Sequence, residues 1–87
     1  MVFVQVALQR TSGNAFKAFT DAIEIIPEVE ECHLVSGEFD FLDKARVKDM
    51  THYKNLLAGS LLQLPNVQES KSYPVMESVV QRSGIRL

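Results

Sequence analysis

The middle of the chain, residues 29–47, reads VEECHLVSGEFDFLDKARV and is the strongest guide to the fold. Apolar and polar residues alternate in two segments, 29–36 and 39–47, on either side of Gly37 and Glu38. Alternation with a period of two is typical of β-strands, and a short glycine-containing loop between two such segments is typical of a hairpin. We therefore expect an antiparallel strand pair at the centre of the chain.

One helix is predicted on each side of this hairpin, because apolar residues recur there at steps of three or four. The first helix covers residues 15–26 and ends before Pro27, and the second covers residues 50–64. Residues suited to cap these helices are Ser12 or Asn14 for the first and Asp49 for the second. The two apolar stripes consist of Phe16, Phe19, Ile23 and Ile26, and of Met50, Tyr53, Leu57, Leu61 and Leu64.

Two further strands are predicted at the ends of the chain. Residues 3–9 alternate between apolar and polar, and residues 67–80 form an extended stretch in which Val67, Tyr73 and Val75 share one parity. Pro74 has no N–H to donate, so we expect an edge strand or a bulge there.

The element order is strand, helix, strand, strand, helix, strand, which predicts an α+β fold. Its expected form is a ferredoxin-like βαββαβ two-layer sandwich, with both helices on one face of an antiparallel sheet. The other face stays uncovered and carries Leu42 and a share of the apolar residues of the first, second and last strands. We therefore expect a dimer with sheets packed face to face, or edge pairing through the last strand and the tail. Residues 1–80 are expected to form one domain and residues 81–87 a tail.

Composition narrows the classes of function. The 87 residues are 46% apolar and 23% charged, with a net charge of −2, which argues against direct nucleic-acid binding. One cysteine allows neither a disulfide framework nor a cysteine-built zinc site. No segment is apolar enough to span a membrane, so a cytoplasmic location is expected. A core this small usually needs support, and oligomerisation is the remaining source.

Catalytic chemistry is not favoured by the polar residues. Cys32 and His33 are neighbours on a strand and therefore point to opposite faces, and so do Asp40 and Asp43. His52 is expected to be exposed, and the acidic residues of segment 28–31 are expected to be solvated. We therefore expect no enzyme activity, no cofactor and no metal, with a small ferredoxin-like enzyme as the least favoured alternative.

The hairpin loop offers binding chemistry instead. Gly37 and Asp40 place free backbone N–H groups beside a carboxylate, which suits the two charged ends of an amino acid. The competing interpretation is a turn in which Asp40 bonds its own backbone.

Residues 31–42 (ECHLVSGEFDFL), with Asp49-Met50, 52–64, Pro65-Asn66-Val67 and Ser70-Lys71-Ser72-Tyr73, resemble the Lrp/AsnC family of transcriptional regulators. The match lies in the family's C-terminal effector-binding and oligomerisation (RAM) domain. The resemblance implies a ferredoxin-like fold, dimers that build octamers or rings, and amino acids bound between dimers. Effector-site positions carry over to Leu34, Gly37, Asp40, Met50, Leu62, Tyr73 and Val75.

This resemblance leaves two functions open. The first is a free-standing sensing domain without its own DNA-binding module, which binds a small amino acid such as leucine or methionine. The second is an assembly-only module that joins full-length Lrp-type regulators. Asp43 stands where the family usually has an apolar residue, so we expect it to reach the rim or to pair with Lys44 or Arg46 of another subunit. Pro74 also departs from the family pattern.

Overall fold

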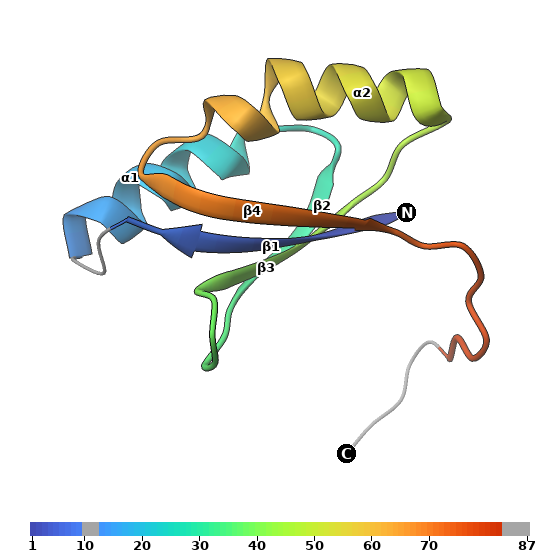
Figure 1. Cartoon of the computed structure of the whole chain (residues 1–87), viewed down its shortest axis with the longest axis horizontal. Coiled ribbons are helices and arrows are strands. Elements are labelled where there is room, and N and C mark those ends of the chain that lie inside the picture. Colours follow the sequence, from blue (N-terminus) through green and yellow to red (C-terminus); the bar gives the residue numbers. More distant parts are fainter. Residues whose placement is uncertain (10–12, 83–87) are drawn as a thin grey trace.

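The computed structural model describes residues 1–9 and 13–82 and has the predicted order of elements (Figure 1). The strands are β1 (Val2–Leu8), β2 (Val29–Leu34), β3 (Phe41–Ala45) and β4 (Val67–Pro74). The helices are α1 (Gly13–Glu24), α2 (Met50–Gly59) and the short 3₁₀ helix η1 (Leu61–Gln63).

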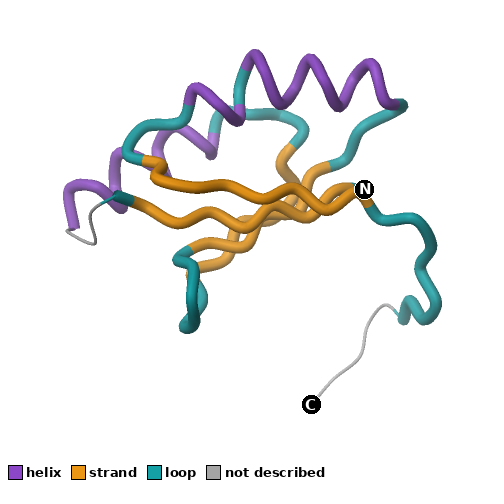
Figure 2. Tube along the Cα trace, viewed as in Figure 1, coloured by secondary structure: helices purple, strands orange, loops and turns teal. Residues whose placement is uncertain are grey.

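The strands form one antiparallel sheet in the order β2-β3-β1-β4. The helices lie together on one face of this sheet and leave the other face bare, as the tube in Figure 2 shows. This arrangement confirms the predicted ferredoxin-like sandwich. It also makes β2 and β4 the edge strands, as expected for a strand that contains Pro74.

The core lies between the sheet and the helices. Every second residue of β1 is buried there, and α1 contributes Phe19 and Ile23. The Phe19 and Phe41 rings lie 4.7 Å apart between their centroids and join α1 to β3. Met50 belongs to the predicted apolar stripe, but its side chain is 60% exposed, since it begins α2 at the margin of the sheet.

The predicted helix ends are partly correct. The Asp49 carboxylate accepts a hydrogen bond from the His52 N–H at 2.8 Å, which confirms the N-cap of α2. Asn14 lies inside α1 and is not its cap, and Ser12 lies outside the described residues. α2 ends at Gly59, five residues early, because the chain tightens into η1.

β4 departs from its predicted parity. Leu8 pairs with Val67 and Ala7 pairs with Glu69, so Gln68 is an extra residue and forms a bulge. Val67 therefore packs against the core, whereas Tyr73, the partner of Phe3, lies on the bare face. The predicted shared face of Val67 and Tyr73 was wrong for this reason.

The last strand is also shorter than predicted. It ends at Pro74, beside Val2 at the start of β1, and the Val75 N–H still donates to the Met1 carbonyl at 2.9 Å. Beyond that bond the described chain leaves the sheet (Figure 1), and Met76 is 99% exposed. The prediction of a strand to residue 80 was therefore wrong.

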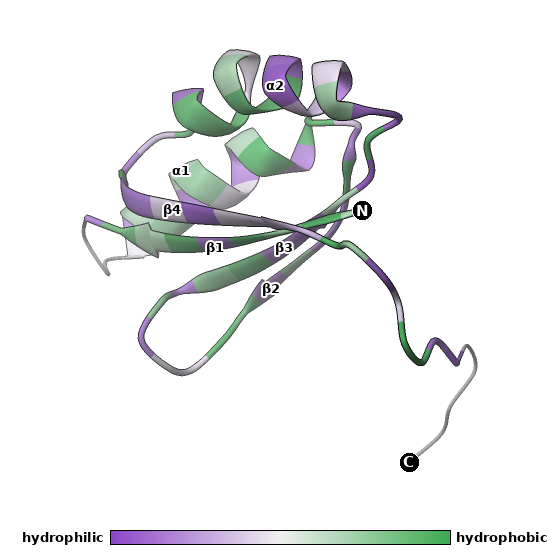
Figure 3. Cartoon of the chain, turned by 45° about the vertical axis from the view of Figure 1, so that its right-hand side comes forward, coloured by the Kyte–Doolittle hydropathy of each residue, from purple (hydrophilic) through white to green (hydrophobic). Residues whose placement is uncertain are grey.

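The bare face of the sheet is mixed in character. Pairing and alternating burial place Leu42 there beside Gln5 and His33, and Lys44 beside Phe3 and Glu31. β4 adds mostly polar residues, visible as its purple bands in Figure 3. The prediction that β2 would add apolar residues was wrong, since its bare-face residues are Glu31 and His33.

Candidate functional site

The hairpin loop between β2 and β3 is the first candidate region. It spans residues 35–40, longer than the predicted break at Gly37 and Glu38. In Figure 1 the loop extends away from the helix layer. The Val35 N–H donates to the Asp40 carbonyl at 2.9 Å and closes the loop. Gly37 is exposed at its tip with φ of 154°, a conformation that favours glycine.

Asp40 is fixed to the central strand β1 by two hydrogen bonds. Its N–H donates to the Val6 carbonyl at 2.9 Å, and its Oδ2 accepts from the Leu8 N–H at 2.8 Å. The loop is thereby held against the end of β1. The carboxylate bonds β1 and not the loop's own backbone, so the simple-turn alternative does not describe it. Among the described residues no other donor reaches this carboxylate.

A second group of predicted residues lies at the opposite end of the sheet. Met50 and Val75 line a shallow cavity of about 220 Å³ together with Pro74 and Tyr53. Tyr73 lies on the bare face nearby, paired with Phe3.

The remaining predicted residues are exposed near the Leu8 end of the sheet. Leu34, the last residue of β2, is 63% exposed, and Leu62 in η1 is 61% exposed. One chain therefore brings Leu34, Gly37 and Asp40 together, and Met50 with Val75, but does not join the two groups. The length of β1 separates them.

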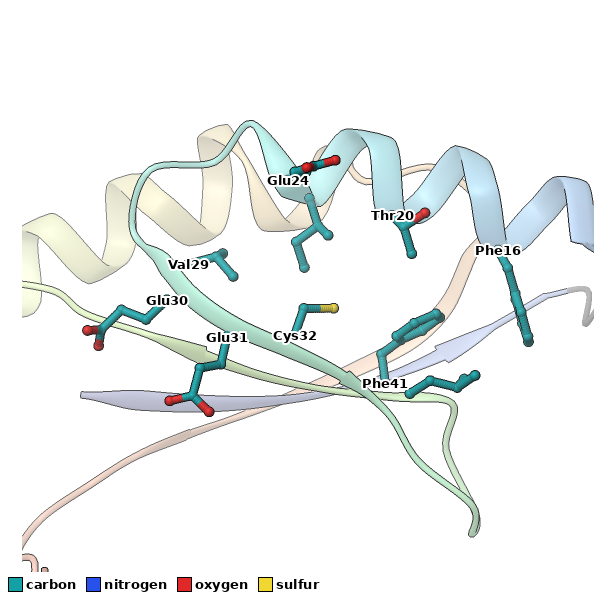
Figure 4. Close-up of a pocket in the computed structure, with 10 residues that line it drawn as sticks. Phe16, Thr20, Glu24, Val29, Glu30, Glu31, Cys32 and Phe41 are labelled. Carbon is teal, nitrogen blue, oxygen red and sulfur yellow. The ribbon is translucent and has the colours of Figure 1, made fainter. Parts of the chain in front are cut away.

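Sequence reasoning missed a groove between α1 and the edge strand β2. It has a volume of about 570 Å³ and an apolar floor that includes Ile23, Cys32 and Phe41. In Figure 4 Cys32 and Phe41 project into the space below α1, whereas the carboxylates of Glu30 and Glu31 point away from the helix. The strand order creates this groove, and no single segment signals it.

Behind the groove lies a buried acid. Asp43 is 1% exposed on the helix-covered face, opposite Cys32 on β2. Burial raises the pKa of Asp43 to about 6, although the Cys32 thiol opposes the shift by hydrogen bonding. Burial also raises the pKa of Cys32 to about 12, and the Asp43 carboxyl adds to the effect. A thiol with so high a pKa is a poor nucleophile.

The expected rim position of Asp43 was wrong, whereas its pairing with Lys44 or Arg46 of another subunit stays a prediction. It does not reach the rim, since it is among the most deeply buried side chains described. Lys44 lies 3.5 Å from Glu31 and Arg46 lies 3.3 Å from Glu30, on the same chain. Both bases sit on the other parity of the hairpin, so they are directed away from Asp43.

His52 has partners that the sequence did not reveal. Its Nε2 lies 2.9 Å from the Glu28 carboxylate, and its Nδ1 accepts from the Lys48 N–H at 3.0 Å. The bond to His52 lowers the pKa of Glu28. His52 is half-buried, so the expected exposed imidazole was wrong, and the contact ties α2 to the start of β2.

Cys32 and His33 point to opposite faces of the sheet, as expected from their neighbouring positions on a strand. His33 is exposed and lies 2.9 Å from Glu31, and this hydrogen bond lowers the pKa of Glu31. Cys32 faces the opposite way, toward Asp43. Within residues 1–9 and 13–82 no cluster of metal-ligating side chains forms, and no helix is long and apolar enough to cross a membrane.

Known proteins are similar to this chain in sequence and in fold. The family model described as the Lrp/AsnC ligand binding domain matches residues 1–85. The leucine-responsive regulatory proteins of Klebsiella pneumoniae and Escherichia coli are 47% identical over 85 residues, which cover 98% of this chain and 52% of theirs. The chain thus spans about half the length of the curated relatives it matches.

Solved structures are also similar to this chain in fold. A transcriptional regulator of Neisseria meningitidis, crystallised as a complex with L-Met, has a TM-score of 0.85 and 26% identity, and the match covers 98% of this chain and 55% of the regulator. Escherichia coli AsnC has a TM-score of 0.83 with 16% identity, and covers 94% of this chain and 54% of its own, which supports the fold. The resemblance found in the sequence is confirmed: the chain belongs to the family of Lrp/AsnC ligand-binding domains.

Proposed function

We propose that this domain binds a small amino acid at an interface between copies of the chain, and that binding changes the assembly. The observation that carries the proposal is the hairpin loop, where the Asp40 carboxylate is fixed to β1 beside the exposed backbone of Gly37. A fixed carboxylate suits an ammonium group, and free backbone N–H groups suit a carboxylate.

A site between copies accounts for the separation of the predicted residues. Leu34, Leu62 and Met50 are large apolar side chains that the single chain leaves more than half exposed. Contact between the hairpin end of one copy and the Met50 end of another would bury them around a ligand. The expected assembly is a homodimer, and a higher oligomer such as an octamer or ring.

The apolar character of these side chains favours leucine or methionine as the ligand. One structural relative, the Neisseria meningitidis regulator, was crystallised with L-Met, and the closely similar curated relatives are named leucine-responsive. Both facts concern those proteins and support the proposal for this one.

Calorimetric titration with each of the twenty amino acids tests the proposal. The sharpest variant is Asp40→Asn, because the amide oxygen can still accept the Leu8 N–H while the charge is removed. We expect the affinity for leucine or methionine to fall roughly tenfold to hundredfold, as for the loss of a charge-assisted hydrogen bond.

The matched control is Asp21→Asn, which removes an exposed carboxylate from α1. It should bind like the wild type. Binding that is equal in all three proteins would contradict the role of Asp40, and no heat or thermal shift with any amino acid would contradict the proposal as a whole.

Pro74 favours a second candidate function, an assembly-only module. It lies between Tyr73 and Val75, two of the predicted contacts, and removes an N–H donor from that strand. The domain would then co-assemble with full-length Lrp-type regulators without sensing a ligand. Native mass spectrometry after co-expression with such a regulator distinguishes the two, since mixed oligomers that ignore amino acids would support the second function. Strictly separate oligomers would contradict it.

A further inference from the structure

Asp43 is an uncompensated acid in the core of the domain. Its side chain is 1% exposed, and neither carboxyl oxygen has a hydrogen-bond partner of good geometry among the described residues. Its neighbours across the sheet are Val4 on β1 and Cys32 on β2, and a thiol is only a weak donor. A charged carboxylate is costly to bury without a partner, whereas a neutral carboxyl costs much less.

Within residues 1–9 and 13–82, the elements packed around Asp43 supply no compensating cation. On β2 the Cys32 thiol and the more distant His33 ring both favour the charged form, yet burial outweighs them and leaves the pKa at about 6. On the core side, β1 places the apolar Val4 next to Asp43, and β4 contributes Ser70 and Ser72, which carry no charge. Tyr53 of α2 has a half-buried phenol. The other ionisable groups of the helices are exposed or, in the case of His52, bound to Glu28; the exposed ones are Lys17, Asp21 and Glu24 of α1 and Lys54 of α2.

The shortest way to hydrate a charged Asp43 leads through β2. Cys32, its cross-strand neighbour, is half-buried and lines the open groove below α1. β2 is an edge strand whose only strand partner in the sheet is β3, and this pairing is interrupted between Val29 and Glu31. An edge strand with an irregular register opens at lower cost than a central strand.

We propose that Asp43 is a proton-binding site that couples pH to the packing of β2: the protonated carboxyl keeps β2 closed against α1 and β3, and loss of the proton opens this edge toward the groove. The domain is then most firmly closed in mildly acidic solution. As the pH rises through the interval from about 4 to about 6, the unfolded state loses this proton while the folded state still holds it. Unfolding then releases a proton, so stability falls with rising pH.

This coupling has a consequence for the hairpin that rests on the proposed function. β2 ends at Leu34 and leads into the loop that contains Gly37 and Asp40, so opening of β2 would weaken an effector site built on that loop. The opening of β2 depends on the Asp43 proton and not on a ligand, so it can be measured in the ligand-free protein.

Amide hydrogen exchange measured by NMR provides the test. Protection factors for β2, corrected for the intrinsic pH dependence of exchange, are compared at pH 4 and pH 7 in wild type, Asp43→Asn and Asp43→Leu. The pKa rises from 3.8 to about 6, and each pKa unit is a tenfold factor, so wild-type protection in β2 should fall by up to about 100-fold. The two variants should lose the pH dependence that is specific to β2.

Controls separate local opening from global change. Amides of the central strand β1 should respond less than those of β2, and Asp21→Asn should behave as wild type because its carboxylate is exposed. The Asp43 side-chain ¹³C signal should titrate near pH 6 in wild type. Titration near pH 4, or equal pH responses in wild type and both Asp43 variants, would overturn the proposal. A response spread evenly over β1 and β2 would overturn the opening of β2.

Discussion

The two faces of the sheet are made by the same four strands but are built on different principles. On β1 the helix-facing residues Val2, Val4, Val6 and Leu8 are all buried, whereas Phe3, Gln5 and Ala7 on the other face are half-buried. The covered face is closed by the chain's own helices and determines whether the domain folds. No helix among the described residues covers the bare face, so we expect its residues to contribute less to folding than those of the covered face.

Asp43 breaks the apolar pattern on the covered face, whereas Leu42 is one of the apolar residues on the mixed bare face. The two residues are adjacent on β3 and point in opposite directions. Substitutions that affect one face and spare the other therefore test the comparison directly.

The largest effect is expected for Phe19→Ala on the covered face. Phe19 is fully buried and stacks on Phe41, so its loss should destabilise the fold by about 3–5 kcal/mol. Urea unfolding followed by circular dichroism measures this. Phe3→Ala on the bare face is the matched control and should cost clearly less. Equal losses would mean that the two faces contribute alike to folding.

The second effect has the opposite sign. Asp43→Leu replaces a buried acid by an apolar side chain of similar size and should stabilise the domain at pH 7 by up to about 3 kcal/mol. The gain should shrink toward pH 4, because Asp43 is then neutral in the folded state. Thermal unfolding at both pH values measures it. A gain that is independent of pH would show that packing, and not charge, makes Asp43 unfavourable.

A smaller effect is expected in the helix layer that covers the sheet. Asp49→Ala removes the side-chain acceptor for the His52 N–H and should destabilise the domain by about 1 kcal/mol. Asp21→Ala, within α1 and exposed, should change the stability by less than about 0.5 kcal/mol. The difference between the two unfolding midpoints gives the contribution of the cap.

The smallest effect on folding, and the most informative for the bare face, is expected for Leu42→Ala. Leu42 is half-buried in the single chain, so the stability of a monomer should change by less than about 1 kcal/mol. If two sheets pack face to face, the Leu42→Ala dimer should nevertheless dissociate at a higher protein concentration than the wild-type dimer does. Sedimentation velocity over a concentration series measures this. A wild-type protein that is monomeric at micromolar concentration would contradict the predicted dimer.

Local patterns predicted much of the fold. The order of elements, the Asp49 cap and the edge position of Pro74 follow from periodicity, from side-chain acceptors and from a missing N–H, which are properties of short segments. The bulge at Gln68 could not be predicted, because a single inserted residue depends on how β4 meets β1.

The candidate site was predicted only in part. The sequence identified the loop and its Asp40, but the bond from the Leu8 N–H joins residues 32 positions apart and no local pattern reveals it. The His52–Glu28 contact and the groove below α1 were missed for the same reason. The two separated groups of predicted residues were not foreseen either, since their positions depend on strand order.

The sequence by itself determined the order of two strand-helix-strand halves, the residue types of the hairpin loop and the family to which the chain belongs. These depend on the identity and spacing of neighbouring residues. Only the tertiary structure decided that Asp43 lies in the core with no better donor than the Cys32 thiol beside it, and that Asp40 is anchored to β1. The physical reason is that the cost of a charge depends on the solvent and partners around it, and long-range strand pairing brings those partners together.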